Sequence, residues 1–231
     1  EKILPKKISV NLKKLSNISG NFALDANLKI YFTENYNIKK NESTFNVSSE
    51  NLKFKLKNKN NNYIIENINS FINFNHHGKI SSKGDFEINN NKNKFEITRQ
   101  NSKNPFKIKT SGTLNIQKTF FNKFDFPVKN EVNYSSETLL KNLQQFNTKL
   151  QFKLDSSEID FSIFNFIKKK GEPSKLELNM FKNKNIIKFD NINFTTNKEK
   201  INIQYLFFNT KKFALQDMGN VNVKIGDKNK F

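Results

Sequence analysis

The sequence predicts an all-β protein built as a single long antiparallel sheet with at most one or two short helical turns. Three observations support this fold class. Apolar and polar residues alternate over many segments, Phe and Ile are abundant, and clusters of Asn and Lys separate the alternating segments. Alternation puts apolar side chains on one face of a strand and polar side chains on the other. Phe and Ile favour a pleated, half-buried surface, whereas Asn is a poor helix former.

The alternation begins close to the first residue and continues to the end of the chain. Ile8, Val10 and Leu12 form the first short run, and residues 22–32 form a longer one. Further runs follow at 52–56, 80–88, 95–97, 106–108, 114–116, 150–154, 176–180, 201–207 and 221–225. Each run predicts a strand with one apolar face and one face turned to water.

Asn/Lys clusters predict tight turns between these strands. They occupy residues 57–62, 89–93, 182–185 and 197–199. Asn tolerates the left-handed backbone conformation that tight hairpins require. Because connections this short join antiparallel neighbours, the sequence predicts a meander.

Two segments depart from the alternating pattern. Thr119–Phe126 is apolar at mixed spacing and precedes Pro127, which predicts a short helix or a turn over a sheet edge. Ser135–Phe146 predicts a helical turn capped by Ser135 or Ser136. No Pro/Gly/Ser-rich linker divides the chain, so we expect one continuous sheet.

The chain carries a formal net charge of +19 and has a pI near 9.8. A partner that bears phosphates would explain this charge. A bias towards AT-rich codons also explains it, since Lys, Asn, Ile and Phe are all enriched. The lysines are spread along the whole chain, which favours the second explanation. Because Phe and Lys fall on opposite strand faces, we expect no nucleic-acid partner.

The sequence offers no convincing catalytic or metal-binding constellation. The chain has no Cys, which excludes disulfides. His76 and His77 are adjacent, and adjacent strand residues point to opposite faces, so a turn pair is favoured over a shared metal. Asp155, Glu158 and Asp160 are interpreted as a solvated strand edge. We therefore expect no enzyme activity, no cofactor and no bound metal.

Lys168–Lys170, directly before Gly171, form a short basic run. Such a run is usually a solvated turn, although it is also suited to contact with an anionic surface. The chain has no apolar stretch of about 20 residues and no signal-peptide pattern. It begins with Glu1 rather than Met, and we expect it to be an interior piece of a longer protein.

From about Phe74 onward the chain resembles the AsmA-like family of bacterial envelope proteins, in particular its YhdP-type branch. The resemblance is carried by short motifs in a fixed order. Gly78–Ile88 (GKISSKGDFEI) and Phe106–Ile116 (FKIKTSGTLNI) resemble two successive steps in which a strand follows a glycine. The most specific motif is KKGEPSKLEL at residues 169–178, and residues 217–223 also fit. The family often has Trp near the lysine–glycine–proline turn, where this chain has Phe164 and Phe166.

The resemblance implies a fold and a function. The fold would be a curved, taco-like sheet that repeats as a β-groove. Residues 1–73 would continue a meander from upstream repeats, and residues 74–231 would form the AsmA-like segment. The function would be transport of phospholipid from the inner to the outer membrane by a periplasmic protein anchored in the inner membrane through a region absent here. Its partners would be phospholipid acyl chains, the inner membrane, and outer-membrane or periplasmic proteins.

The candidate groove lining consists of apolar residues taken from the alternating runs. They are Phe22, Leu24, Leu28, Ile30, Leu52, Phe54, Leu56, Phe86, Ile88, Phe106, Ile108, Leu114, Ile116, Leu150, Phe152, Leu154, Leu176, Leu178, Ile201, Ile203, Tyr205, Val221 and Val223.

Two alternatives account for the same alternation. A fragment of an outer-membrane β-barrel also alternates, but it carries aromatic girdles at its strand ends, whereas Phe here is scattered along the strands. A plain structural or adhesive β-sandwich would bury the apolar faces against each other. Without the resemblance, composition alone favours the sandwich.

Overall fold

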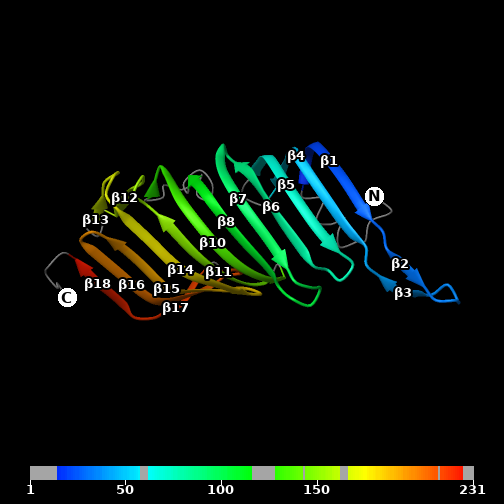
Figure 1. The fold of residues 1–231 in the computed structure, drawn as a ribbon. Coiled ribbons are helices and arrows are strands. Elements are labelled where there is room, and N and C mark those ends of the chain that lie inside the picture. The colour runs from blue at the N-terminus through cyan, green and yellow to red at the C-terminus, as the bar shows by residue number, and fades with distance from the viewer. Residues whose placement is uncertain are drawn as a thin grey trace. The chain divides into compact units, whose positions relative to one another are not determined.

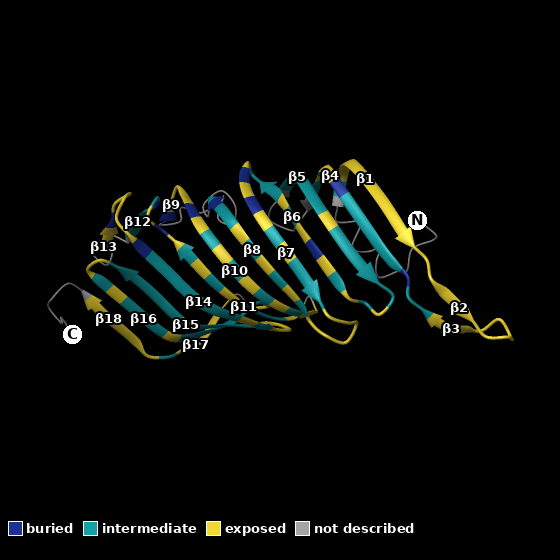
Figure 2. Cartoon of the chain, in the orientation of Figure 1, coloured by how far each residue is buried: buried dark blue, intermediate teal, exposed yellow. Residues whose placement is uncertain are grey.

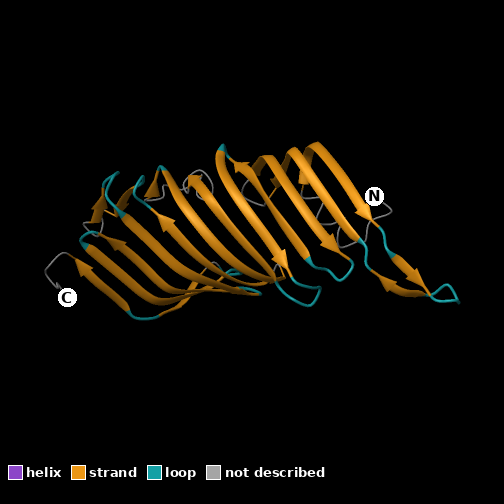
Figure 3. Cartoon of the chain, in the orientation of Figure 1, coloured by secondary structure: helices purple, strands orange, loops and turns teal. Residues whose placement is uncertain are grey.

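The computed structural model describes residues 15–57, 62–115, 128–142, 144–161, 166–212 and 214–225. These residues form eighteen strands and no helix (Figures 1 and 3). Thirteen strands belong to one antiparallel sheet in the order β1-β4-β5-β6-β7-β8-β10-β11-β14-β15-β16-β17, with β18 also paired to β16. The prediction of an all-β fold built on one large antiparallel sheet is confirmed.

The chain divides into two compact units, residues 1–104 and 105–231. The sequence boundary at residues 73 and 74 marked the start of the family resemblance, and it falls inside one strand of unit 1. Unit 1 contains β1 (Leu15–Asn27), β2 (Ile30–Phe32), β3 (Ile38–Asn41), β4 (Thr44–Lys57), β5 (Asn62–Asn75), β6 (Ile80–Ile88) and β7 (Asn91–Arg99). β2 and β3 form a separate hairpin.

Unit 2 contains a long run of sheet strands and a small second sheet. Its strands are β8 (Phe106–Asn115), β9 (Val128–Lys129), β10 (Glu131–Asn142), β11 (Gln145–Lys153), β12 (Glu158–Phe161), β13 (Phe166–Lys168), β14 (Ser174–Asn183), β15 (Ile186–Thr196), β16 (Glu199–Asn209), β17 (Ala214–Met218) and β18 (Val221–Ile225). β12 pairs with both β9 and β13 to form the small sheet.

Turns fall where the Asn/Lys clusters predict them. Asn89 and Asn90, between β6 and β7, have φ values of 50° and 66°. Lys184, between β14 and β15, has φ 51°. Two consecutive left-handed residues give a hairpin turn whose twist matches that of the flanking strands, and Asn adopts this conformation at little cost. The cluster at 57–62 lies mostly outside the described residues.

The helical turn predicted at Ser135–Phe146 is wrong. Residues up to Asn142 belong to β10, which pairs along its length with β8 and β11. Hydroxyl pairs tie the three strands together, with Thr110 bonded to Ser136 at 2.7 Å and Thr138 bonded to Thr148 at 2.9 Å. Pairing on both sides outweighs the local capping signal of a short segment. The other predicted exception, Thr119–Phe126, lies outside the described residues.

Candidate functional site

Cross-strand register defines one apolar face in unit 1. Directly paired residues lie on the same face of a sheet. Val47 of β4 pairs with Leu24 of β1 and with Ile72 of β5. The same row continues through β6 to Ile97 of β7. The next row contains Phe45 and Phe74, whose rings stack with their centroids 4.9 Å apart.

Small residues lie between the apolar rows of unit 1. Ser49 pairs with Ser70, and their hydroxyls are 2.8 Å apart. Ser70 pairs in turn with Gly84, where an added Cβ would lie 2.3 Å from the carbonyl oxygen of Asn69. Most side chains of β4–β7 are half-buried, whereas β1 is exposed over nearly all its described length (Figure 2). Unit 1 thus presents an apolar face with a low row of small side chains.

Unit 2 presents an apolar face of the same kind. One row runs from Tyr134 through Phe152, Leu176 and Phe194 to Ile201. Burial raises the pKa of the Tyr134 hydroxyl above its ordinary value, and a hydrogen bond with Thr110 partly offsets this effect. Tyr134 is half-buried in this row, which is the cause of the shift.

The small sheet covers one end of this face. Val132 of β10 is fully buried, and Ile159 of β12 is only 2% exposed. The ring of Phe166, in β13, packs edge-on against Phe194, in β15, with centroids 5.6 Å apart. Five buried hydrophobic residues form this closed core: Leu114, Val128, Val132, Leu154 and Ile159.

The basic run at 168–170 is divided between this core and solvent. Lys168 is only 1% exposed, and its Nζ donates to the carbonyl oxygens of Ser157 at 2.8 Å and Lys169 at 3.1 Å. Burial lowers the pKa of Lys168, while the charges of Glu172 and Asp155 act in the opposite direction. The expectation of a wholly solvated run is therefore wrong at Lys168. Its side chain is buried and bonds β13 of the small sheet to the carbonyl oxygen of Ser157.

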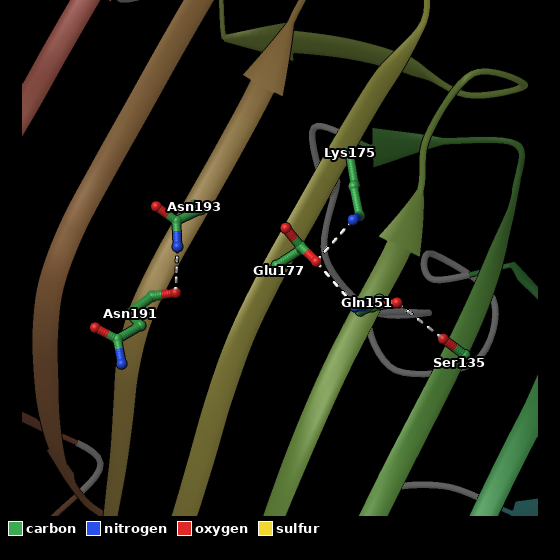
Figure 4. A network of polar contacts seen from close by, with 6 residues as sticks. All are labelled: Ser135, Gln151, Lys175, Glu177, Asn191 and Asn193. Carbon is green, nitrogen blue, oxygen red and sulfur yellow. Dashed lines mark hydrogen bonds and ion pairs between the residues drawn. The ribbon is translucent and has the colours of Figure 1, made fainter.

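The opposite face of the sheet is a network of polar side chains. In unit 2, Gln151 accepts a hydrogen bond from Ser135 and donates to Glu177 at 2.9 Å (Figure 4). Glu177 also pairs with Lys175 at 2.7 Å. In β15 (residues 186–196), Asn193 donates to the carbonyl oxygen of Asn191 in the same strand. These bonds satisfy the polar groups while leaving them accessible to water, so this face needs no covering layer.

Most of the predicted lining residues share the apolar face of their own unit. In unit 1 they are Phe22, Leu24, Leu52, Phe54, Phe86 and Ile88. In unit 2 they are Phe106, Ile108, Leu114, Leu150, Phe152, Leu176, Leu178, Ile201, Ile203, Val221 and Val223.

Six predicted lining residues, Tyr205 among them, do not join these sets. Leu28 follows the last residue of β1, and Ile30 belongs to the separate β2–β3 hairpin, so neither lies in the large sheet. Leu154 follows the last residue of β11 and lies in the closed core, to which Leu114 of β8 also contributes from the apolar face. The side chain of Leu56 and all of Ile116 fall outside the described parts of the chain.

Tyr205 lies on the polar face, contrary to the prediction. It pairs with Asp190, which pairs with Asn179 among the polar residues. The Tyr205 hydroxyl donates to the carboxylate of Asp217 at 3.2 Å, and this contact raises the pKa of Tyr205. The alternation from Ile203 does not hold because β14 and β15 change register beside Asn191, which has φ 51°.

The same irregularity hides other residues of the apolar face. Phe189 and Leu206 pair with each other, and Phe189 pairs with Met180 on this face. Phe189 lies three residues before Ile192, and Leu206 lies three residues after Ile203, so neither fits an alternation with a period of two. The Asn at position 191 is the sequence signal that marks such a bulge. In unit 1, the rows that contain Phe45, Val47, Ile72 and Phe74 follow plain alternation and were detectable.

The histidine and carboxylate candidates occupy structural positions. His76 and His77 lie in the turn between β5 and β6, with ring centroids 3.6 Å apart. An oxygen of the Asp155 carboxylate accepts the backbone N–H of Ser174 at 2.8 Å. Within the described residues, no group of three His, Cys, Asp or Glu side chains is arranged to hold a metal ion.

Within the same residues, no helix is long and apolar enough to cross a membrane. No family model, curated protein or solved structure matches this chain.

Proposed function

We propose that this chain is a non-enzymatic segment of a lipid-transfer bridge whose apolar face carries phospholipid acyl chains between the inner and outer membranes of a bacterial envelope. The observation that carries the proposal is the extent of apolar surface without a second layer. Among the described residues of unit 2, the small sheet covers one end of the apolar face and leaves Leu178, Met180 and Leu206 only half-buried.

The energetics suit an acyl chain better than water. Each CH₂ group that leaves water contributes about 0.8 kcal/mol. Polar side chains such as Gln151 and Glu177 bond to one another on the polar face, whereas the apolar face gains from an apolar partner. The AsmA-like motifs quoted above support the same function, in which the parent protein is anchored in the inner membrane and crosses the periplasm. Carrying a lipid along a sheet requires no covalent step, so a catalytic group has no role in this proposal.

Lipid content after purification tests the proposal. The full chain is purified without detergent, and native mass spectrometry and lipid extraction measure bound phospholipid per chain. We expect phospholipid in the wild type and a large loss in Leu178→Glu, because a carboxylate on the apolar face disfavours acyl chains. Asn179→Glu is the matched control, since the neighbouring side chain is equally half-buried and lies on the polar face. Equal lipid content in the two variants contradicts the proposal.

A structural β domain is the second candidate, and the closed core of unit 2 favours it. A small sheet packed on a larger one is the arrangement of a two-layer domain. This alternative predicts a wild-type chain that purifies without phospholipid and remains monodisperse. It also predicts that Leu178→Glu changes stability only, with no change in lipid content.

A further inference from the structure

One end of the unit 2 strands carries lysines and no carboxylates. Three neighbouring connections meet there: 141–145 between β10 and β11, 182–186 between β14 and β15, and 209–213 between β16 and β17. The three segments contain five lysines and neither Asp nor Glu. These lysines, Lys141, Lys182, Lys184, Lys211 and Lys212, are called the lysine rim below.

Hydrogen bonds join the three connections into one continuous edge. The backbone N–H of Lys184 donates to the carbonyl oxygen of Gln144 at 2.9 Å. The backbone N–H of Thr210 donates to the carbonyl oxygen of Asn185 at 2.8 Å, and the Thr210 hydroxyl donates to the same oxygen at 3.0 Å. The lysine rim is therefore held by the backbone of adjacent turns, and its positive charges cannot separate freely.

The rim lysines lie at the surface without a carboxylate partner among the residues that the structure describes. Lys141, Lys184, Lys211 and Lys212 are exposed, and Lys182 is half-buried. Among the described residues, none of the five forms an ion pair. Like charges on adjacent strands repel one another, so this edge favours an anionic partner.

The opposite ends of the same strands have a different charge pattern. There, carboxylates accompany the lysines: Asp155 and Glu172 lie beside the turn that enters β14, and Glu199 begins β16. The distinguishing feature is the exclusion of carboxylates from one end of the strands.

Exposed apolar side chains lie among the rim lysines. Leu139 is 45% exposed, Ile186 is 43% exposed and Leu215 is 53% exposed. Phe181, beside Lys182, is 38% exposed. Aliphatic side chains cannot stack on nucleic-acid bases, but they do enter the boundary between lipid headgroups and acyl chains. A combination of lysines with mainly aliphatic residues favours a membrane surface over a nucleic acid.

We infer that the lysine rim docks unit 2 onto the surface of an anionic phospholipid bilayer. The lysines contact headgroup phosphates, and Leu139, Ile186 and Leu215 enter the interface. This inference concerns an edge of the sheet and does not require lipid on the apolar face. A chain that carries no acyl chains would still bind vesicles through the rim.

Vesicle co-sedimentation of the full chain tests the inference. The vesicles are pure phosphatidylcholine, or phosphatidylcholine with about a third phosphatidylglycerol. The rim variant is Lys141→Gln/Lys184→Gln/Lys211→Gln, with one change in each connection. The control is Lys153→Gln/Lys198→Gln/Lys224→Gln, which removes the same charge from exposed lysines at the opposite strand ends.

A lysine near an anionic surface contributes about fivefold to partitioning, so the rim variant should bind the anionic vesicles roughly 100-fold more weakly than the wild type. The control should lose much less, and Ile186→Ser should weaken the binding that persists in high salt.

Equal losses in the rim variant and the control overturn the inference, because general positive charge would then explain binding. Tighter binding of wild type to single-stranded nucleic acid than to anionic vesicles overturns it as well. Phospholipid that co-purifies with the chain, measured in the same samples, should not change in the rim variant.

Discussion

Units 1 and 2 share one kind of sheet but bury different residues. Every buried hydrophobic residue in the described parts of the chain lies in unit 2, under or within the small sheet. The buried residues of unit 1 are polar and small: Ser43, Ser49, Ser82, Asn91 and Asn93. A single layer shields short side chains between taller neighbours on the same face, but it leaves the tall apolar ones partly in water.

The comparison shows what a second layer contributes. In unit 2 the three strands of the small sheet convert one end of an apolar face into a closed core. In unit 1 the described strands of the large sheet depend on backbone pairing and on contacts along the apolar face, such as the Phe45–Phe74 stack. An acyl chain that covers the apolar face of a unit should therefore raise the free energy of unfolding more in unit 1 than in unit 2, where a closed core already contributes.

The largest expected effect is at the closed core. Ile159→Ala should lower the free energy of unfolding by about 2–5 kcal/mol, because Ile159 is 2% exposed and its truncation leaves a cavity between the two sheets. Denaturant unfolding measures the change. The control is Ile167→Ala in the neighbouring strand β13, where the side chain is 59% exposed. It should cost less than about 0.5 kcal/mol. Similar costs at both positions would contradict the assignment of the core.

A smaller effect is expected where unit 1 packs backbone against backbone. Gly84→Ala should destabilise the chain by about 1–3 kcal/mol, since the new Cβ would lie 2.3 Å from the Asn69 carbonyl oxygen and 2.9 Å from Cα of Ser70. The control is Ser81→Ala in the same strand, where the side chain is exposed. Unfolding followed by circular dichroism measures both. A neutral Gly84→Ala would show that β5 and β6 separate at little cost.

Alternation and turn composition predicted most of the fold. The predicted runs at 80–88 and 176–180 alternate with a period of two and lie in β6 and β14, and Asn89 and Asn90 provide the left-handed turn that the pattern required. These features depend on residues close together in sequence, so they can be detected without a structure.

The features that escaped prediction depend on contacts distant in sequence. Lys168 is part of a basic run in sequence, yet pairing of β13 with β12 carries it into a core. Tyr205 changes face because of an irregularity in the neighbouring strands, beside Asn191. The lysine rim was not visible because its three segments lie about 25 to 40 residues apart along the chain and meet only through sheet pairing.

A third prediction concerns the apolar face of unit 1. Phe45→Ala should lower the free energy of unfolding by about 1–2 kcal/mol, because it removes a stacked ring from a face that no described strand of unit 1 covers. The control is Tyr36→Ala in the β2–β3 turn, where the side chain is 88% exposed and little should change. If acyl chains cover this face, delipidation of the wild type should reduce the difference between wild type and Phe45→Ala. A difference that does not depend on bound lipid would indicate that the face is stabilised by its own side chains alone.

The smallest expected effect is a dependence on pH at Lys168 in the closed core of unit 2. Burial lowers the pKa of Lys168 in the folded chain below the ordinary 10.5 that it has when unfolded. Between those two values the unfolded chain binds more protons, so the free energy of unfolding should rise with pH in that interval. Below the lowered pKa, Lys168 is charged in both states and the full cost of burying the charge remains. Urea unfolding from neutral pH to about pH 10.5 should therefore show the stability of the wild type rising relative to Lys168→Met. The control is Lys169→Met, which removes the exposed lysine next to Lys168 and should follow the wild-type slope. Parallel curves for wild type and Lys168→Met would contradict the prediction, because the Lys168 amine would then keep its ordinary pKa inside the core.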